Sequence, residues 1–229
     1  MWIKICGNTS LNDAQLAADL GADALGFIFA SSKRHVTAAE VTRITPRLPQ
    51  HIERVGVFDS HNADEIAAIT REAGLTAIQF HGGVDQSLVH RLHEIFEDNV
   101  KLIQTIHWTI DSTDSAATVA SQLDEIHRAG IVQRVLIDSK VGQASGGTGV
   151  SFNWKAAKAV LTENANGLSI IVAGGLRPEN VAEAIHGLTP WGVDVSSGVE
   201  REPREKDPAK LAAFIKNARQ ASQESQHTT

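Results

Sequence analysis

Short apolar runs alternate with amphipathic stretches along the whole chain. Eight of these runs have the length of strands. Several of them, such as Ala-Leu-Gly-Phe-Ile-Phe and Ser-Ile-Ile-Val-Ala, are almost continuously apolar, which is typical of parallel strands covered on both faces. The predicted strands are Ile3–Cys6, Ala24–Phe29, Arg54–Phe58, Ala77–His81, Val100–Ile106, Arg134–Asp138, Ser169–Ala173 and Val193–Ser196.

The stretches between these runs carry the start and stop signals of helices. Three of them begin with a capping residue that is followed three positions later by an acidic residue. These pairs are Ser10 with Asp13, Thr37 with Glu40, and Asn62 with Glu65. Helix ends are marked by Gly21, Gly74, Gly130 and Gly187. Eight strand–helix units predict one parallel α/β sheet, and closure into a single (β/α)8 barrel fits this count better than the alternative, an open doubly wound sheet.

Length and composition support a single domain. The 229 residues suit one barrel, which we expect to span residues 1–218 and to be followed by a frayed polar tail over 219–229. A formal net charge of −6 without a basic patch argues against a nucleic-acid partner. Because there is one cysteine, Cys6, and neither a secretory leader nor a membrane-length apolar run, we expect a cytoplasmic protein without membrane contact.

In such a barrel, the loops after the strands build the active site at their carboxyl ends. Small residues follow the last two predicted strands, at Gly174–Gly175 and at Ser196, Ser197 and Gly198. Glycine lets backbone N–H groups approach an anion closely, and these two loops are the usual phosphate site of this fold. A small phosphorylated ligand is therefore predicted, although the same glycines would also suit simple tight turns.

An acid–base pair is predicted at the ends of two other strands. Cys6 ends the first strand, where electropositive surroundings would give a usable thiolate. Asp138 ends the sixth, after an apolar run that should raise its pKa and let it donate a proton. The alternatives are a buried cysteine that acts as a small hydrophobe and an aspartate that caps a helix or forms a loop ion pair.

Further polar residues follow the same strand ends. Arg34 could hold a carboxylate through both arms of its guanidinium, or it could be an ordinary surface cation. A glycine-rich loop over 142–149, which includes Gly147, is expected to cover the site, or else to be a flexible linker without a role in it. His81, His107 and Asp138 could instead converge on a metal ion, as in a metal-dependent sugar-phosphate epimerase, but they lack a ligand-spacing signature. A barrel that binds a phosphorylated ligand without catalysis is the third hypothesis.

Motifs in nearly every unit resemble those of the phosphoribosylanthranilate isomerase family of tryptophan biosynthesis. They are residues 4–8 (KICGN), 25–29 (LGFIF) with Ser32–Arg34, 55–58 (VGVF), 79–82 (QFHG), 136–139 (LIDS) with 146–149 (GGTG), 173–181 (AGGLRPENV), and 192–200 (GVDVSSGVE) with Lys206–Asp207. Where this family usually has Pro-Gly-x-Lys-Asp, the chain has Arg204 at the glycine position, and a side chain there is expected to change the turn.

The resemblance implies an aldose–ketose isomerase that performs an Amadori rearrangement without a cofactor or metal. It implies that Asp138 protonates the furanose ring oxygen and that Cys6 removes the proton from C2. It also implies that Arg34 holds the anthranilate carboxylate. The residues that would line the sugar and phosphate pockets are Gln79, His81, Gly147, Gly174, Gly175, Ser196, Ser197 and Gly198. We expect the partner to be the small phosphorylated substrate and the protein to be a monomer or a homodimer.

Overall fold

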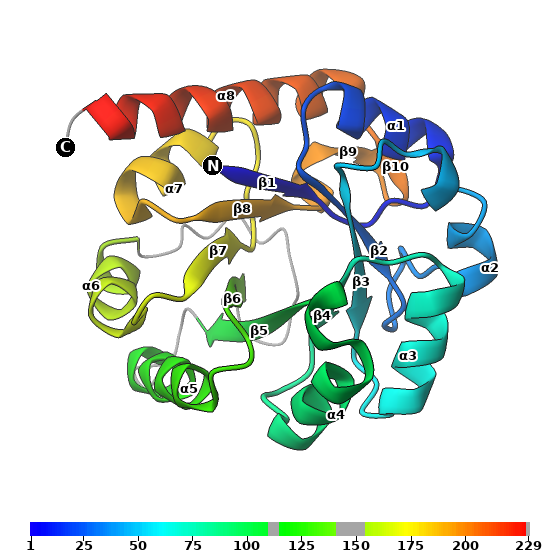
Figure 1. Ribbon diagram of the computed structural model, residues 1–229. Helices are drawn as coiled ribbons and strands as arrows, with labels where there is room; N and C mark the ends of the chain where they lie inside the picture. Colours follow the sequence, from blue (N-terminus) through cyan, green and yellow to red (C-terminus); the bar gives the residue numbers. More distant parts are fainter. Residues whose placement is uncertain (110–114, 141–153, 228–229) are drawn as a thin grey trace.

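The computed structural model describes residues 1–109, 115–140 and 154–227. Within these ranges, eight parallel strands close into a barrel in chain order, and helices surround it (Figure 1). The strands are β1 (Trp2–Ile5), β2 (Ala24–Ile28), β3 (Glu53–Phe58), β4 (Ala77–Phe80), β5 (Lys101–Thr109), β6 (Arg134–Lys140), β7 (Ser169–Ala173) and β8 (Gly192–Val195). Because β1 pairs with β8, with Ile3 opposite Val193, the sheet is closed and the open alternative is excluded.

Helices follow the strands around the outside of the barrel (Figure 1). They are α1 (Leu11–Asp19), α2 (Ala38–Val41), α3 (Ala63–Glu72), α4 (Gln86–Phe96), α5 (Ser115–Ala129), α6 (Trp154–Asn164), α7 (Val181–Leu188) and α8 (Pro208–His227). Short 3-10 turns lie at η1 (Thr45–Arg47), η2 (Glu97–Asn99) and η3 (Ser197–Val199). A small antiparallel hairpin of β9 (Glu200–Glu202) and β10 (Glu205–Lys206), which the sequence did not predict, lies between β8 and α8.

The predicted helix signals are confirmed in most places. The side chains of Ser10, Thr37 and Asn62 accept backbone N–H groups at the starts of α1, α2 and α3, and Thr37 forms the full capping box. Gly187 is an exception, because it lies inside α7. The left-handed residue that ends this helix is Thr189, with φ 47°.

The chain end also differs from the expectation. Helix α8 continues to His227, through most of the segment that was predicted to be a frayed tail. Ala218 and Ala221 are buried, and Arg219 donates to the Gly21 carbonyl and to the Asp23 carboxylate. These contacts fasten the last helix against the loop between α1 and β2. None of the helices in the described ranges is long and apolar enough to cross a membrane.

The barrel interior changes from apolar to polar toward the carboxyl ends of the strands. An apolar layer of Trp2, Ala24, Val55, Ala77, Ile103, Leu136 and Ile171 fills the amino-terminal half, and Ala173, the last residue of β7, extends this cluster toward the carboxyl end. Above it lies a buried polar layer of Lys4, Gln79, Thr105 and Asp194. A much larger apolar cluster between the strands and the helices stabilises the outer face of the sheet. The inside of the barrel therefore consists of an apolar layer beneath a polar layer at the carboxyl-terminal mouth.

Candidate active site

Cys6 lies directly after β1, at the mouth of the barrel. Its backbone N–H donates to the Val195 carbonyl over 2.8 Å, which extends the pairing with β8 by one residue. Side chains alternate along a strand, so Cys6 faces the barrel interior like Trp2 and Lys4. The residue is only 6% exposed. Cys6 is thus buried at the top of the polar layer.

The polar layer beneath Cys6 is built around the fully buried Lys4. Its ammonium donates to Gln79 Oε1 over 2.8 Å and to Asp194 Oδ1 over 3.0 Å. Gln79 in turn donates to Thr105 Oγ1 over 3.1 Å, so both ends of its amide are engaged inside the protein. Gln79, predicted to line the sugar pocket, therefore lies below the mouth and supports Lys4.

The expectation that Cys6 forms a thiolate easily is wrong, because the surroundings of Cys6 raise the pKa of its thiol. Burial raises the pKa of the Cys6 thiol, and the Asp194 carboxylate adds to this effect. Lys4 and Lys206 act in the opposite direction but do not cancel the effect of burial. The predicted electropositive neighbours are present, yet the net direction of the pKa shift is upward. Any thiolate formed here depends on these two ammonium groups.

Asp138 lies near the carboxyl end of β6 and faces the same interior. Leu136, two residues earlier, belongs to the apolar layer inside the barrel, so the alternation of side chains points Asp138 inward as well. Its Oδ2 lies 3.8 Å from Nδ1 of His107, the residue opposite it on β5. The Asp138 side chain is 19% exposed, which leaves it accessible to a ligand at the mouth.

His107 and His81 form the wall beside Asp138. Nε2 of His107 lies 3.1 Å from the carbonyl oxygen of His81, and the two rings meet edge to face at 4.9 Å. Since a carbonyl only accepts, Nε2 of His107 carries the hydrogen. Nδ1 of the same ring is then the atom that faces Asp138. Both histidines are half-buried near the carboxyl ends of β4 and β5.

Gly7 brings Arg34 and Ser196 together beside Cys6. Its φ is +74°, and an added Cβ would lie 2.6 Å from Arg34 Cδ and 2.9 Å from Ser196 Oγ. The missing side chain is therefore what lets the loop after β2 and the end of β8 meet over the loop after β1. Three predicted site residues from three separate strand ends become neighbours in this way.

The Arg34 guanidinium is already paired with a carboxylate of the protein. Nε donates to Glu200 Oε1 over 2.7 Å, and Nη2 donates to Glu200 Oε2 over 2.5 Å. Arg34 thus binds a carboxylate through two N–H groups, but this carboxylate is the protein's own Glu200, which occupies the Nε–Nη2 edge of the guanidinium. A guanidinium has five N–H donors, so Arg34 can still offer its Nη1 edge to a second carboxylate.

The two predicted phosphate loops lie against each other. Gly174, with φ +88°, has no room for a side chain because Ser139 fills that space, whereas Gly175 faces open space. A Cβ on Gly198 would overlap the Leu176 carbonyl, so the loop after β8 packs directly on the loop after β7. The glycines at 174 and 198 therefore serve close packing, and Gly175 remains the exposed backbone position.

Ser196 and Ser197 belong to the loop after β8, which together with Gly175 forms the predicted phosphate corner of the mouth. Ser197 is exposed, whereas Ser196 Oγ is buried and has no hydrogen-bond partner among the described residues. A buried hydroxyl without a partner is uncommon, and a bound ligand oxygen would satisfy it. Gly147, the remaining predicted contact, lies outside the described residues.

Sequence reasoning assigned no role to three charged residues around the site. Lys4, Glu200 and Lys206 are all buried, and all lie within 3.2 Å of an oppositely charged partner. The signal for Lys4 was its position two residues before Cys6 on one strand, which places both side chains on the same face. Glu200 and Lys206 show no such alternation, because their hairpin is too short for periodicity, and the signal for them was their place in the family-like segments 192–200 and Lys206–Asp207.

The geometry does not form the alternative metal site. In the described parts of the chain, no three histidine, cysteine, aspartate or glutamate side chains are grouped to hold a metal ion. His81 and His107 meet through a ring edge and a backbone carbonyl, which is a packing arrangement.

Comparison with known proteins gives the same picture over nearly the whole chain. The N-(5'-phosphoribosyl)anthranilate (PRA) isomerase family pattern matches residues 3–217. A relative from Geotalea daltonii, named N-(5'-phosphoribosyl)anthranilate isomerase, is 39% identical over 219 residues, which cover 95% of this chain and 96% of the relative.

Solved structures agree with the sequence comparison. The phosphoribosyl anthranilate isomerase of Thermotoga maritima superposes with a TM-score of 0.82 at 32% identity, covering 96% of this chain and 99% of that one. A phosphoribosyl anthranilate isomerase in complex with reduced 1-(o-carboxyphenylamino)-1-deoxyribulose 5-phosphate gives a TM-score of 0.79 at 31% identity, with the same coverage.

Proposed function

This chain belongs to the N-(5'-phosphoribosyl)anthranilate isomerase family of enzymes, and we propose that Cys6 and Asp138 are the base and the acid of its Amadori rearrangement. The observation that carries this assignment is their placement. Both groups face the interior at the carboxyl-terminal mouth of the barrel, from β1 and β6. In the closed barrel, β7 and β8 separate these two strands on one side and four strands separate them on the other, so a bound sugar can have one group on each side.

Ring opening is the first step. Asp138 gives its proton to the furanose ring oxygen, the bond from C1 to that oxygen breaks, and a protonated Schiff base forms between C1 and the anthranilate nitrogen. The carboxylate that remains on Asp138 faces His107 Nδ1 at 3.8 Å. A protonated imidazole at this distance would stabilise that carboxylate.

Proton removal from C2 follows. The Cys6 thiolate takes this proton, and the C2–H electron pair forms the C1–C2 double bond while the Schiff base returns to an amine. The resulting enolamine tautomerises to the aminoketone. Because burial raises the pKa of Cys6, the thiolate needs the positive charges of Lys4 and Lys206.

Anion-binding groups at the mouth hold the two charged ends of the substrate. Arg34 offers its remaining guanidinium edge to the anthranilate carboxylate. The exposed backbone at Gly175, together with Ser197 and the unpartnered Ser196 hydroxyl, suits the phosphate. The structural relative that holds a reduced phosphorylated product analogue supports a ligand of this size and charge.

The direct test is consumption of phosphoribosylanthranilate by the purified protein. We expect loss of the fluorescence of the substrate, and we expect the gene to restore growth of a tryptophan auxotroph that lacks this step. Failure of both assays with folded protein would contradict the proposal. Chelator treatment before the assay is expected to leave turnover unchanged, since the acid, the base and the anion-binding groups are all side-chain or backbone groups of the chain.

A further inference from the structure

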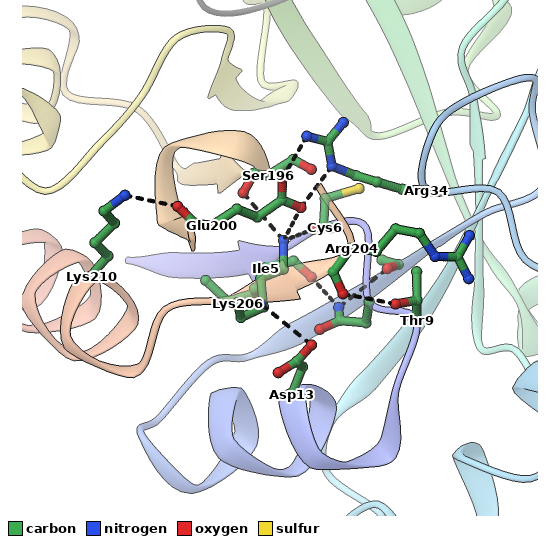
Figure 2. Close-up of polar contacts among 12 residues, drawn as sticks. Ile5, Cys6, Thr9, Asp13, Arg34, Ser196, Glu200, Arg204, Lys206 and Lys210 are labelled. Carbon is green, nitrogen blue, oxygen red and sulfur yellow. Dashed lines mark hydrogen bonds and ion pairs between the residues drawn. The ribbon is translucent and has the colours of Figure 1, made fainter. Parts of the chain in front are cut away.

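A nearly inaccessible ammonium group lies behind the proposed base. Lys206, at the end of β10, is 2% exposed. Its Nζ donates to the Cys6 carbonyl over 2.6 Å, to the Ser196 carbonyl over 3.2 Å and to Glu200 Oε1 over 3.2 Å (Figure 2). An ammonium has three N–H donors, so these contacts use its full capacity. No donor is left over for a substrate.

The three acceptors belong to the parts of the site that must be aligned. The hydrogen bond from Lys206 to the Cys6 carbonyl holds the backbone of the proposed base. The hydrogen bond to the Ser196 carbonyl holds the residue after β8 at the phosphate corner. Glu200 carries the link onward, because its two carboxylate oxygens hold Arg34 over 2.7 and 2.5 Å. One buried charge therefore connects the base, the phosphate corner and the carboxylate-binding arginine.

The electrostatics of this cluster agree with a continuous chain of ion pairs. Burial alone would raise the pKa of Glu200, but hydrogen bonds from Arg34 and the charge of Lys206 hold it below its ordinary value. Glu200 is thus a carboxylate that accepts from two cations at once. A buried carboxylate shared in this way has a single favourable position, which restricts the orientation of both partners.

We propose that Lys206 is a positioning residue for the isomerase reaction, which sets the proposed base Cys6, the end of β8 and Arg34 at fixed distances from one another. This inference rests on the proposed function. In this role the β9–β10 hairpin, which carries Glu200 and Lys206, supports the site residues through hydrogen bonds (Figure 2). The hairpin is held in turn from outside, where the Thr9 hydroxyl donates to the Arg204 carbonyl.

The test compares Lys206→Met with Lys216→Met, a matched control on the exposed face of α8. Steady-state turnover of phosphoribosylanthranilate gives kcat and KM, and urea unfolding reports stability. For Lys206→Met we expect kcat to fall by about 10- to 100-fold, because small misplacements of a reacting group have effects of this size. Lys216→Met is expected to retain wild-type kcat and KM.

The pH dependence of kcat/KM separates a positioning role from a purely structural one. The charged groups that act on Cys6 are Lys4, Asp194, Arg34 and Lys206. Loss of the Lys206 charge removes one of the groups that lower the pKa of the thiol, so the acidic limb of the profile is expected to move to higher pH. Unchanged kcat and an unchanged limb in folded Lys206→Met would overturn the proposal.

Two further variants keep every outcome informative. If Lys206→Met does not fold, Glu200→Gln decides, since it breaks the link to Arg34 without removing a buried cation; a wild-type KM and kcat for this variant would overturn the proposal. Cys6→Ser is assayed beside them. If Cys6→Ser keeps full turnover, the assignment of the base itself fails. If Cys6→Ser is inactive while Lys206→Met is fully active, only the positioning role fails.

Discussion

The side chains of Cys6 and Lys4 share the space above Gly26. A Cβ added to Gly26 would lie 2.6 Å from Cys6 Sγ and 3.0 Å from Lys4 Cε. The sulfur and the lysine stem therefore both approach the backbone of β2, at a place where no other residue type would fit. This arrangement puts the buried cation next to the proposed base.

Gly26→Ala is expected to disturb this contact. The new methyl group would also lie 3.1 Å from the Cys6 Cα, so rotation of side chains alone cannot make room. We expect a loss of about 1–3 kcal/mol in the free energy of unfolding, which is typical of overpacking, together with reduced turnover. Urea unfolding and steady-state kinetics measure the two effects. Gly83→Ala is the control, because nothing lies within 4 Å of its added Cβ; equal losses in both variants would contradict the account.

Lys4 is expected to control how readily Cys6 ionises. Lys4→Met removes the cation that most strongly lowers the pKa of the thiol, so that pKa should rise further. Since Cys6 is the single cysteine, the pH dependence of its alkylation by iodoacetamide reports this directly. The alkylation midpoint should move to higher pH in Lys4→Met and stay in place in Lys101→Met, an exposed control. A midpoint that stays in place or falls in Lys4→Met would count against the role of Lys4.

Arg34→Lys tests the carboxylate-binding edge. The substitution keeps the charge but replaces a planar fork by a point charge, so it cannot offer one pair of N–H groups to Glu200 and a second N–H edge to a substrate carboxylate. We expect a loss of about 2 kcal/mol or more in transition-state binding, seen as a fall of about 30-fold or more in kcat/KM. Binding of inorganic phosphate should change little, because Arg34 is not assigned to the phosphate corner. A wild-type kcat/KM in Arg34→Lys would contradict the role of Arg34 in binding the substrate carboxylate.

Much of this fold could be predicted from the sequence because its strands are buried on both faces. The bounds of each predicted strand lie within two residues of the observed ones, except that β5 continues three residues further, to Thr109; β6 continues two residues further, to Lys140. These two strands remain paired to their last residues, beyond the apolar runs that marked them. The strand ends then fixed which polar residues could meet, and Cys6, Arg34 and Ser196 do meet.

The charged supports of the site were harder to predict. A lysine or glutamate in a sequence is ordinarily a surface residue, and only its partner shows that it is buried. Lys4 and Asp194 are 190 positions apart, and Lys206 reaches Cys6 across 200 positions. Nothing local in the sequence marks such pairs, so the direction of the Cys6 pKa shift could not be predicted either.

Arg204 adopts a backbone conformation that ordinarily favours glycine. A side chain here was expected to change the turn, yet Arg204 adopts φ +79° within the hairpin. Its guanidinium donates to the His35 carbonyl at an exposed position. The backbone at Arg204 is therefore strained.

Arg204→Gly is expected to relieve this strain. The gain should be about 1 kcal/mol in the free energy of unfolding, because the exposed bond to His35 that it loses contributes little. Arg204→Ala loses the same bond but keeps the strain, so it should be no more stable than the wild type. Urea unfolding of the three proteins distinguishes the two effects; an Arg204→Gly protein less stable than Arg204→Ala would contradict the argument.

The most direct measurement is the single-turnover rate of phosphoribosylanthranilate consumption by Cys6→Ala and Asp138→Asn beside the wild type. Both substitutions are small, and retention of the wild-type unfolding midpoint would show that the fold is intact. The account predicts that each variant loses about 10²- to 10⁴-fold in rate, as expected when a general acid or base is removed. A folded variant of either residue that turns over the substrate at close to the wild-type rate would contradict it.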